Sequence, residues 1–178
     1  ICQSLDQLIR YIHTWNSVFH IFGHSSRFHG CHTGQDIYLF MQATISGQFH
    51  PLFKFIQTQS IYNLDKYEEW MKLARDRGLH EQVYILAGMT PMKSAGMAKY
   101  MKNRVPGMDV PDALVKRLAD TPKEKQAEEG IKICIEDIQR LKEVEGVSGF
   151  HVMAIEWEEK VPEIVEKAGL YPRPQIQE

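Results

Sequence analysis

The sequence has few cysteines, no long apolar run and no excess of charge of either sign. Three cysteines in 178 residues, Cys2, Cys31 and Cys134, are odd in number and widely spaced, which argues against a disulfide framework and favours a reducing cytoplasm. A formal net charge of -2 gives no electrostatic basis for binding nucleic acid or an anionic membrane. No apolar stretch approaches the roughly 20 residues that span a bilayer, and the first residues lack a signal-peptide pattern. We therefore expect a soluble globular chain with one ordinary core.

Lysine and glutamate are missing from the beginning of the chain. No Lys precedes Lys54 and no Glu precedes Glu68, and residues 1–50 hold only four charged side chains. Six of the eight histidines fall in the same stretch. From about Phe53 onward Lys and Glu are frequent. This change in composition divides the chain into an atypical His-rich segment, residues 1–53, and a second region, residues 54–178.

Three interpretations of residues 1–53 are open. They are a foreign or frame-shifted stretch joined to the second region, a divergent region that packs on it, or a metal module. The third interpretation rests on the run "HIFGHSSRFHGCH", which offers side chains that zinc accepts, namely His20, His24, His29, Cys31 and His32. No standard zinc spacing is matched, so we predict no metal site.

Strands and helices alternate from residue 55 onward. Residues 55–62, 83–87 and 150–155 are apolar or β-branched runs that predict strands, and Met108–Val110 is expected to add a short one. Helices are expected after Asn63 or Asp65, which are alternative caps, and over residues 94–102, 121–144 and 162–167. Four such βα units predict a parallel α/β sheet, either half of an eight-stranded barrel or a small open sheet. Neither of the common glycine-rich nucleotide fingerprints is present.

Two of these helices carry clear apolar faces. In the first, Tyr67, Trp70, Met71 and Ala74 recur at helical spacing, and Gly78 stands where the helix should end. In the third, the sequence Thr-Pro-Lys-Glu at 121–124 predicts a start with Thr121 as the cap. Its apolar face is formed by Ile131, Cys134, Ile135, Ile138 and Leu141.

Four short motifs carry a family resemblance over about residues 54–174. They are "FIQTQSIY" with Thr-Gln at a strand end, "VYILAGMTP" with Gly-x-x-Pro after the next strand, the Val-Pro-Gly turn of "NRVPGMDVP", and "GFHVMAIEW" with Phe-His in the last strand. In combination they resemble the C-terminal half of methylenetetrahydrofolate reductase. The resemblance implies a (β/α)8 TIM barrel that holds FAD and reduces 5,10-methylenetetrahydrofolate to 5-methyltetrahydrofolate in one-carbon metabolism, which is an oxidoreductase reaction on a CH–NH group.

The resemblance also implies site residues at the carboxyl ends of the strands, where such barrels place their chemistry. Gln59 matches a glutamine that hydrogen-bonds the pterin, and Gln57 lies on the same face of that strand. Thr90, with Pro91, would form the mouth of the sixth strand, and Val105-Pro106-Gly107 would lead into the seventh.

Three positions depart from the best-known bacterial pattern of the family. Met97 replaces a substrate-binding glutamine, Met101 replaces a stacking aromatic residue, and Trp157 stands near a substrate-contacting arginine. Met97 and Met101 are expected either to pack on a flavin or pterin ring or to fill the core. The departures leave the electron donor open between NAD(P)H and a partner redox subunit.

The first half of the barrel has no counterpart in this sequence. The family's catalytic glutamate has no candidate, because no Glu precedes Glu68, and we assign neither catalytic nor flavin-contacting residues. A half barrel exposes sheet edges, so the chain is expected to self-associate or to need the absent half. The alternative function is a non-catalytic binding protein on a remnant half barrel with a His-rich metal-binding segment. His151 is expected to be structural, and Asp109 and Asp112 to be helix caps.

Overall fold

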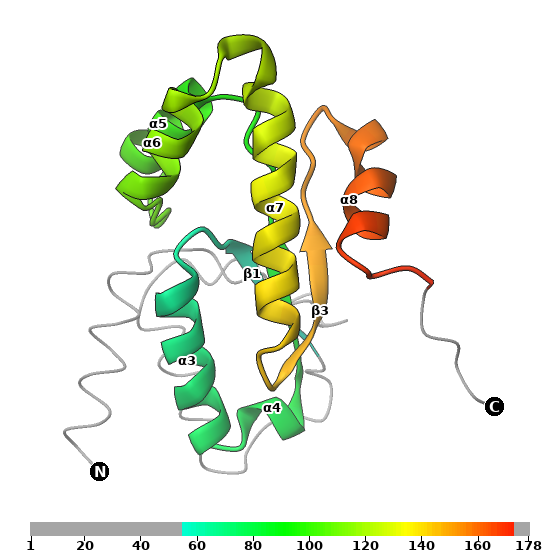
Figure 1. The fold of residues 1–178 in the computed structure, drawn as a ribbon. Coiled ribbons are helices and arrows are strands. Elements are labelled where there is room, and N and C mark those ends of the chain that lie inside the picture. Colours follow the sequence, from blue (N-terminus) through cyan, green and yellow to red (C-terminus); the bar gives the residue numbers. More distant parts are fainter. Residues whose placement is uncertain (1–54, 173–178) are drawn as a thin grey trace, which may run out of the picture.

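A computed structural model describes residues 55–172 (Figure 1). Three strands, β1 (Phe55–Ser60), β2 (Tyr84–Met89) and β3 (Val147–Val152), form one parallel sheet in the order β1-β2-β3. Helices α3 (Leu64–Asp76) and α4 (Leu79–Gln82) connect β1 to β2. The longer connection from β2 to β3 contains α5 (Ala95–Arg104), α6 (Asp112–Asp120), the 3-10 turn η1 (Lys123–Lys125) and α7 (Gln126–Lys142). After β3 come η2 (Glu158–Lys160) and α8 (Val161–Lys167). The α/β class with a parallel sheet is confirmed.

The predicted fourth strand at Met108–Val110 is wrong. This segment is irregular, and β3 pairs directly with β2 over five residue pairs. Its Asp109 carboxylate instead accepts hydrogen bonds from Asn63 and Lys66 at the start of α3. Residues 55–172 therefore contain three βα units rather than the four that the sequence predicted.

The predicted start of the long helix at Thr121 is also wrong. Residues 112–120, which carried no helix prediction, form α6, and Thr121 ends that helix with its hydroxyl donating to the carbonyl oxygen of Arg117 (2.9 Å). The 3-10 turn η1 follows, and α7 begins only at Gln126. Asp112 is the first residue of α6 and binds Lys102, so neither it nor Asp109 is the helix cap that the sequence suggested.

The first helix follows the sequence more closely. The side chain of Asn63 caps α3 by accepting from the backbone N–H of Lys66 (3.2 Å), which selects it over Asp65. Gly78 follows the end of α3 with a φ of 67°, a left-handed conformation that favours glycine. The end of the helix near Gly78 is thereby confirmed.

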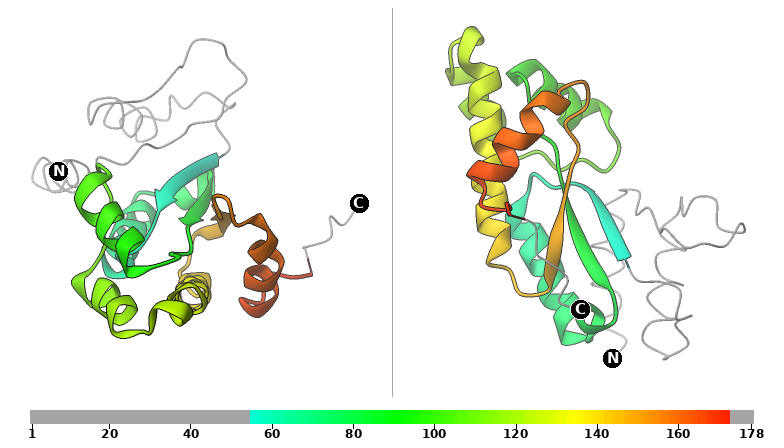
Figure 2. Two further views of the ribbon diagram at one scale, coloured as in Figure 1. Left: turned by 90° about the horizontal axis from the view of Figure 1, so that it is seen from above. Right: turned by 90° about the vertical axis from the view of Figure 1, so that its right-hand side faces the viewer.

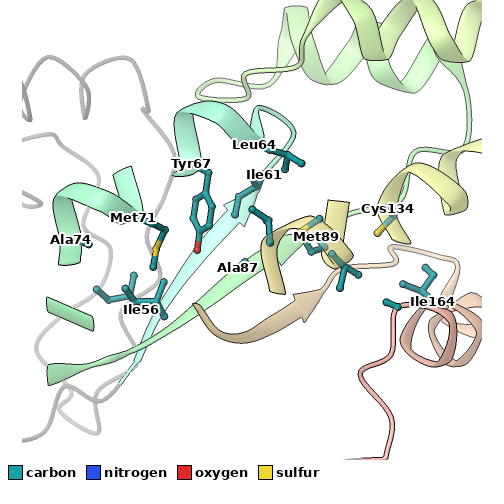
Figure 3. Close-up of a cluster of buried hydrophobic side chains, with 14 of the residues drawn as sticks. Ile56, Ile61, Leu64, Tyr67, Met71, Ala74, Ala87, Met89, Cys134 and Ile164 are labelled. Carbon is teal, nitrogen blue, oxygen red and sulfur yellow. The ribbon is translucent and has the colours of Figure 1, made fainter. Parts of the chain in front are cut away.

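One face of the sheet is packed against helices (Figure 3). The strands contribute Ile56, Ile85, Ala87 and Met89, all less than 4% exposed. The predicted helix faces meet them and are confirmed at their centres, with Tyr67, Met71 and Ala74 from α3 and Ile131, Cys134, Ile138 and Leu141 from α7. Ile164 and Ala168 complete the cluster from the end of the described chain. Burial of these apolar side chains is the main favourable contribution to folding.

A second, smaller cluster joins α5, α6 and α7. It consists of Tyr62, Met92, Ala95, Ala98, Val110, Leu118 and Ile133. At its surface Arg117 of α6 binds Glu129 and Glu136 of α7, each at 2.6 Å. Burial of Val110 in this cluster explains why the segment before α6 does not join the sheet.

Helix α7 lies along the sheet (Figures 1 and 2). Arg140 binds Asp65 at 2.5 Å and Glu68 at 2.6 Å, which ties α7 to α3. Although α7 is the longest helix of residues 55–172, no helix in this range combines the length and apolar character needed to cross a membrane.

Candidate functional site

The second face of the sheet is covered by none of the described helices (Figure 2). We call it the helix-free face and define it by Phe55, Gln57, Tyr84, Leu86, Gly149 and His151. Phe55 and Tyr84 are paired across the strands with ring centroids 5.3 Å apart, and Gln57 is paired with Leu86. A Cβ placed on Gly149 would lie 3.2 Å from Leu86 Cδ2, so these two residues share the face. His151 follows Gly149 by two residues and so points to the same side.

The carboxyl ends of β1 and β2 are held together by hydrogen bonds around Gly88. The Thr58 hydroxyl accepts from the Gly88 N–H and donates to the Gln59 carbonyl oxygen, both at 2.9 Å. The register between the strands shifts at this point, and a Cβ on Gly88 would overlap the Gln59 carbonyl oxygen. Only glycine permits this close approach of two backbones.

The two strand ends are also joined by side chains beyond the ladder. The Ser60 and Thr90 hydroxyl oxygens lie 2.5 Å apart. Thr90 is only 4% exposed, so this hydrogen bond is largely removed from water. It fixes the end of β1 against the loop that follows β2.

Three buried polar atoms near these strand ends have no hydrogen-bond partner among the described residues. They are Oε1 of Gln59, in β1, the hydroxyl oxygen of Tyr62, two residues after β1, and Nδ1 of His151, in β3. A buried polar atom without a partner costs about 1–3 kcal/mol, and such atoms are rare in native proteins. Binding sites are where this cost is offset, because a ligand supplies the missing partner.

The structure brings together some of the residues that the sequence selected. Gln59 lies at the carboxyl end of β1 and Thr90 directly follows β2, whereas Gln57 lies two residues before Gln59, in the amino half of β1. Met97 lies in the first turn of α5, where its sulfur accepts from the Lys93 N–H (3.5 Å), next to the same loop. Met101 lies one turn further along α5 and packs against the second apolar cluster, as a core residue would.

The loops that follow β2 and β3 are linked by Lys93. Its ammonium group lies 5.4 Å from the centroid of the Trp157 ring and donates to the Glu156 carbonyl oxygen (3.0 Å). Glu156 has a φ of 51°, which is unusual for a residue other than glycine. This contact holds Trp157 beside the carboxyl ends of the strands.

Titratable groups behind the sheet are shifted by burial. Burial raises the pKa of Asp137 from 3.8 to about 7, and Glu136 adds to the rise, whereas Arg117 and Arg140 lower it. Burial also raises the pKa of the Cys134 thiol to about 12 and that of Tyr62 above its usual range. A thiol with such a pKa stays protonated and is a poor nucleophile.

Residues 55–172 contain no group of three or more His, Cys, Asp or Glu side chains arranged to hold a metal ion. The His20–His32 cluster that the third interpretation of the N-terminal segment invoked lies outside the described residues. Among the described residues, the strand ends therefore offer amides, hydroxyls and a single imidazole rather than a grouped set of metal ligands.

Comparison with protein families decides the relationship. The sequence profile of methylenetetrahydrofolate reductase matches residues 3–169. The chain belongs to the methylenetetrahydrofolate reductase family. A search of curated protein sequences gave no match.

Membership of the methylenetetrahydrofolate reductase family confirms the resemblance carried by the four motifs. It supports an oxidoreductase function and connects the parallel sheet with the TIM-barrel architecture of the family. The match begins at residue 3, so it extends beyond the region 54–174 and includes most of the His-rich segment. The origin and role of residues 1–53 stay a prediction, because their structure is not described.

Sequence reasoning missed two features of this site. His151 was expected to be a satisfied structural residue, whereas its Nδ1 is buried without a partner among the described residues. The alternation of Phe150, His151 and Val152 was the available signal, because the two apolar neighbours pack on the helices and leave His151 on the other face. The Lys93–Trp157 contact joins residues 64 positions apart and had no local signal.

Proposed function

We propose that this chain is a flavin-dependent methylenetetrahydrofolate reductase, which reduces 5,10-methylenetetrahydrofolate to 5-methyltetrahydrofolate. Within the matched family, the observation that carries the proposal is the buried amide oxygen of Gln59 at the end of β1. An amide offers both a donor and an acceptor, which suits the edge of a pterin. A bound pterin would supply the partner that Oε1 lacks among the described residues.

The described residues fit a planar heterocycle such as FAD or a pterin. Gln59 in β1 and His151 in β3 each carry a buried polar atom without a partner among the described residues. The same strand ends contain the backbone of Gly88 and the hydroxyls of Ser60 and Thr90, which are hydrogen-bonded to each other. When bound, the flavin would supply the hydride that reduces the methylene group. The protein's part at this end of the sheet is binding and orientation.

Gln59 is the residue that we propose orients the substrate, with Gln57 and Thr90 in support. The Thr58–Gly88 hydrogen bond fixes the backbone at Gln59, and the Ser60–Thr90 hydrogen bond fixes the loop beside it. A side chain held by such supports loses less conformational entropy when it binds a ligand. Met97 is proposed to pack on the ring system from the first turn of α5, as a polarisable side chain can.

The electron donor is proposed to be either NAD(P)H or a partner redox subunit. Met97, Met101 and Trp157 differ from the pattern that would bind NADH directly, which favours a partner subunit. The two donors are distinguished by adding NADH to the purified flavoprotein under anaerobic conditions. Loss of the flavin absorbance on addition of NADH alone supports NAD(P)H as the direct electron donor. Loss of this absorbance only after a reductase partner is added supports a partner redox subunit as the donor.

Absorption spectroscopy tests the proposed function. The purified chain is titrated with FAD, and 5-methyltetrahydrofolate is then added under anaerobic conditions with no other electron acceptor. A separate assay follows the oxidation of 5-methyltetrahydrofolate by an artificial electron acceptor. A bound-flavin spectrum that bleaches with folate supports the proposal. A colourless chain that neither binds FAD nor oxidises 5-methyltetrahydrofolate would overturn it and favour a non-catalytic binding role.

A matched pair of variants assigns the role of Gln59. Gln59→Ala is expected to weaken 5-methyltetrahydrofolate binding about tenfold, the loss of one well-placed hydrogen bond. Gln139→Ala is the control, because Gln139 is an exposed residue of α7 that donates to the carbonyl oxygen of Lys167. Equal affinities in the two variants would contradict the role of Gln59.

A further inference from the structure

His151 occupies a defined position on the helix-free face. It is paired with Gly88 of β2, which has no side chain, and Gly149 precedes it by two residues on the same face. Phe150 and Val152 on either side pack against the helix-covered core. The imidazole therefore has neither a directly paired side chain on β2 nor a side chain at the preceding position of its own face.

The buried Nδ1 of His151 is not explained by packing. A structural histidine donates or accepts at each buried ring nitrogen, because a nitrogen that is removed from water without a partner costs free energy. Nδ1 has no such partner among residues 55–172. Two further atoms near the strand ends are in this state, the hydroxyl oxygen of Tyr62 and Oε1 of Gln59, and the proposed function assigns the second of them to a ligand.

We infer that His151 is a second ligand-binding residue, whose Nδ1 hydrogen-bonds the amide-like N–H or C=O edge of a planar nitrogen heterocycle. The inference rests on the proposed function and deepens it. A neutral imidazole nitrogen serves as donor or acceptor according to its tautomer, so it matches either group of such an edge. The isoalloxazine ring of FAD and the pterin ring of folate both carry this edge, and they are the two sources to distinguish.

The first test measures stability without any ligand. Leucine is close to histidine in volume but has no polar atom, so His151→Leu removes the unpartnered nitrogen. We expect the urea midpoint of the ligand-free chain to be unchanged or higher in His151→Leu. A clearly lower midpoint would mean that His151 makes a structural hydrogen bond, and would overturn the inference.

The second test measures affinity for two probes, FAD and 5-methyltetrahydrofolate. His151→Leu is expected to weaken one of them about tenfold. A loss confined to FAD assigns the flavin edge, and a loss for 5-methyltetrahydrofolate with FAD unchanged assigns the pterin edge. His151→Asn, whose short amide places a polar atom near the position of Nδ1, is expected to recover most of the affinity. Unchanged affinities for both probes in His151→Leu would overturn the inference.

His80 provides the matched control. Its Nδ1 is also buried without a partner among the described residues, but it lies in α4, before β2 and away from the carboxyl ends of the strands. His80→Leu is expected to leave both affinities unchanged. If the unmodified chain binds neither probe, the proposed function fails and the inference fails with it. If the unmodified chain binds a probe and His151→Leu binds both probes with the same affinities as the unmodified chain, the inference alone fails.

Discussion

The two faces of the sheet are made by the same three strands but by different kinds of residue. On the helix-covered face, Ile56, Ile85, Ala87 and Met89 are almost fully buried and wholly apolar. On the helix-free face, Phe55 and Tyr84 are 44% and 57% exposed, and Gln57 and His151 bring polar groups into the strands. Alternation along a strand allows this division, since successive side chains point to opposite sides.

The difference between the two faces separates residues that stabilise the fold from residues that are available to contact a ligand. A close-packed apolar face contributes stability and tolerates little change. The other face is lined partly by glycine and carries a polar atom whose partner the described residues do not supply. Mutations on the first face should therefore act on stability, and mutations on the second should act on ligand binding.

The largest effect is expected where the helix-covered side is tightest. A Cβ on Gly130 of α7 would overlap the backbone carbonyl oxygen of Met92, so Gly130→Ala forces α7 away from the loop after β2. We expect a loss of about 4 kcal/mol or more in the free energy of unfolding, measured by urea titration. Gly96→Ala is the control, because its nearest neighbour would be Ser94 Oγ at 3.6 Å. That variant should be neutral or up to about 1 kcal/mol more stable. Similar midpoints for both variants would contradict the packing of α7.

Adjacent residues of β2 compare the two faces directly. Ile85 is fully buried in the main core, whereas Leu86 is half-buried on the helix-free face. Ile85→Ala is expected to cost about 3 kcal/mol because it leaves a cavity, and Leu86→Ala about 1 kcal/mol. Urea unfolding of the two variants measures the difference. Equal losses would mean that both faces are packed to the same degree.

Burial raises the pKa of the Asp137 carboxyl group, in α7 behind the sheet. This shift predicts that the stability of the fold depends on pH. The pKa of Asp137 is raised to about 7 in the native state, mainly by burial, so between about pH 4 and 7 the native chain binds a proton that the unfolded chain has released. The contribution of the protonated Asp137 to the free energy of unfolding is therefore fully present below about pH 4, and it is lost as the pH rises to about 7.

Asp137→Asn removes this titration. At pH 8 the variant should exceed the original chain in stability by on the order of 2 kcal/mol, and near pH 4 the two should be similar. Urea titrations at a series of pH values measure the difference. A variant that is less stable at pH 8 would show that the ionised carboxylate makes a favourable interaction.

The smallest effect is expected for the link between the loops at the strand ends. Lys93→Met removes the ammonium group beside Trp157 and should cost about 0.5–1 kcal/mol, whereas Lys93→Arg keeps the cation and should cost less. Thermal unfolding and tryptophan fluorescence monitor the change. An unchanged fluorescence spectrum in Lys93→Met would argue against the contact with Trp157.

Local signals in the sequence predicted much of the secondary structure. The apolar run at 83–87 became β2, the helical spacing of Tyr67, Met71 and Ala74 became the buried face of α3, and Asn63 became its cap. Each of these features depends on neighbours within a few residues. The strand predicted at 150–155 was displaced to Val147–Val152, because its limits follow from pairing with β2.

Errors in the prediction fall where distant residues decide the local structure. Met108–Val110 has the composition of a short strand, but Asp109 is bound by Asn63 and Lys66, and Val110 is buried among helices. Thr121 has the pattern of a helix start, yet it ends α6, whose Arg117 is bound to α7. Interactions across 12 to 46 positions outweighed the local preference in both cases.

The sequence by itself determined the family, the parallel α/β class and the selection of Gln59, because motifs and apolar periodicity are local properties of the chain. Only the tertiary structure decided that β3 lies directly beside β2 and that His151 faces the side opposite the helices with a buried, unpartnered nitrogen. Whether a polar atom finds a partner depends on which distant segments surround it, and no sequence pattern expresses that.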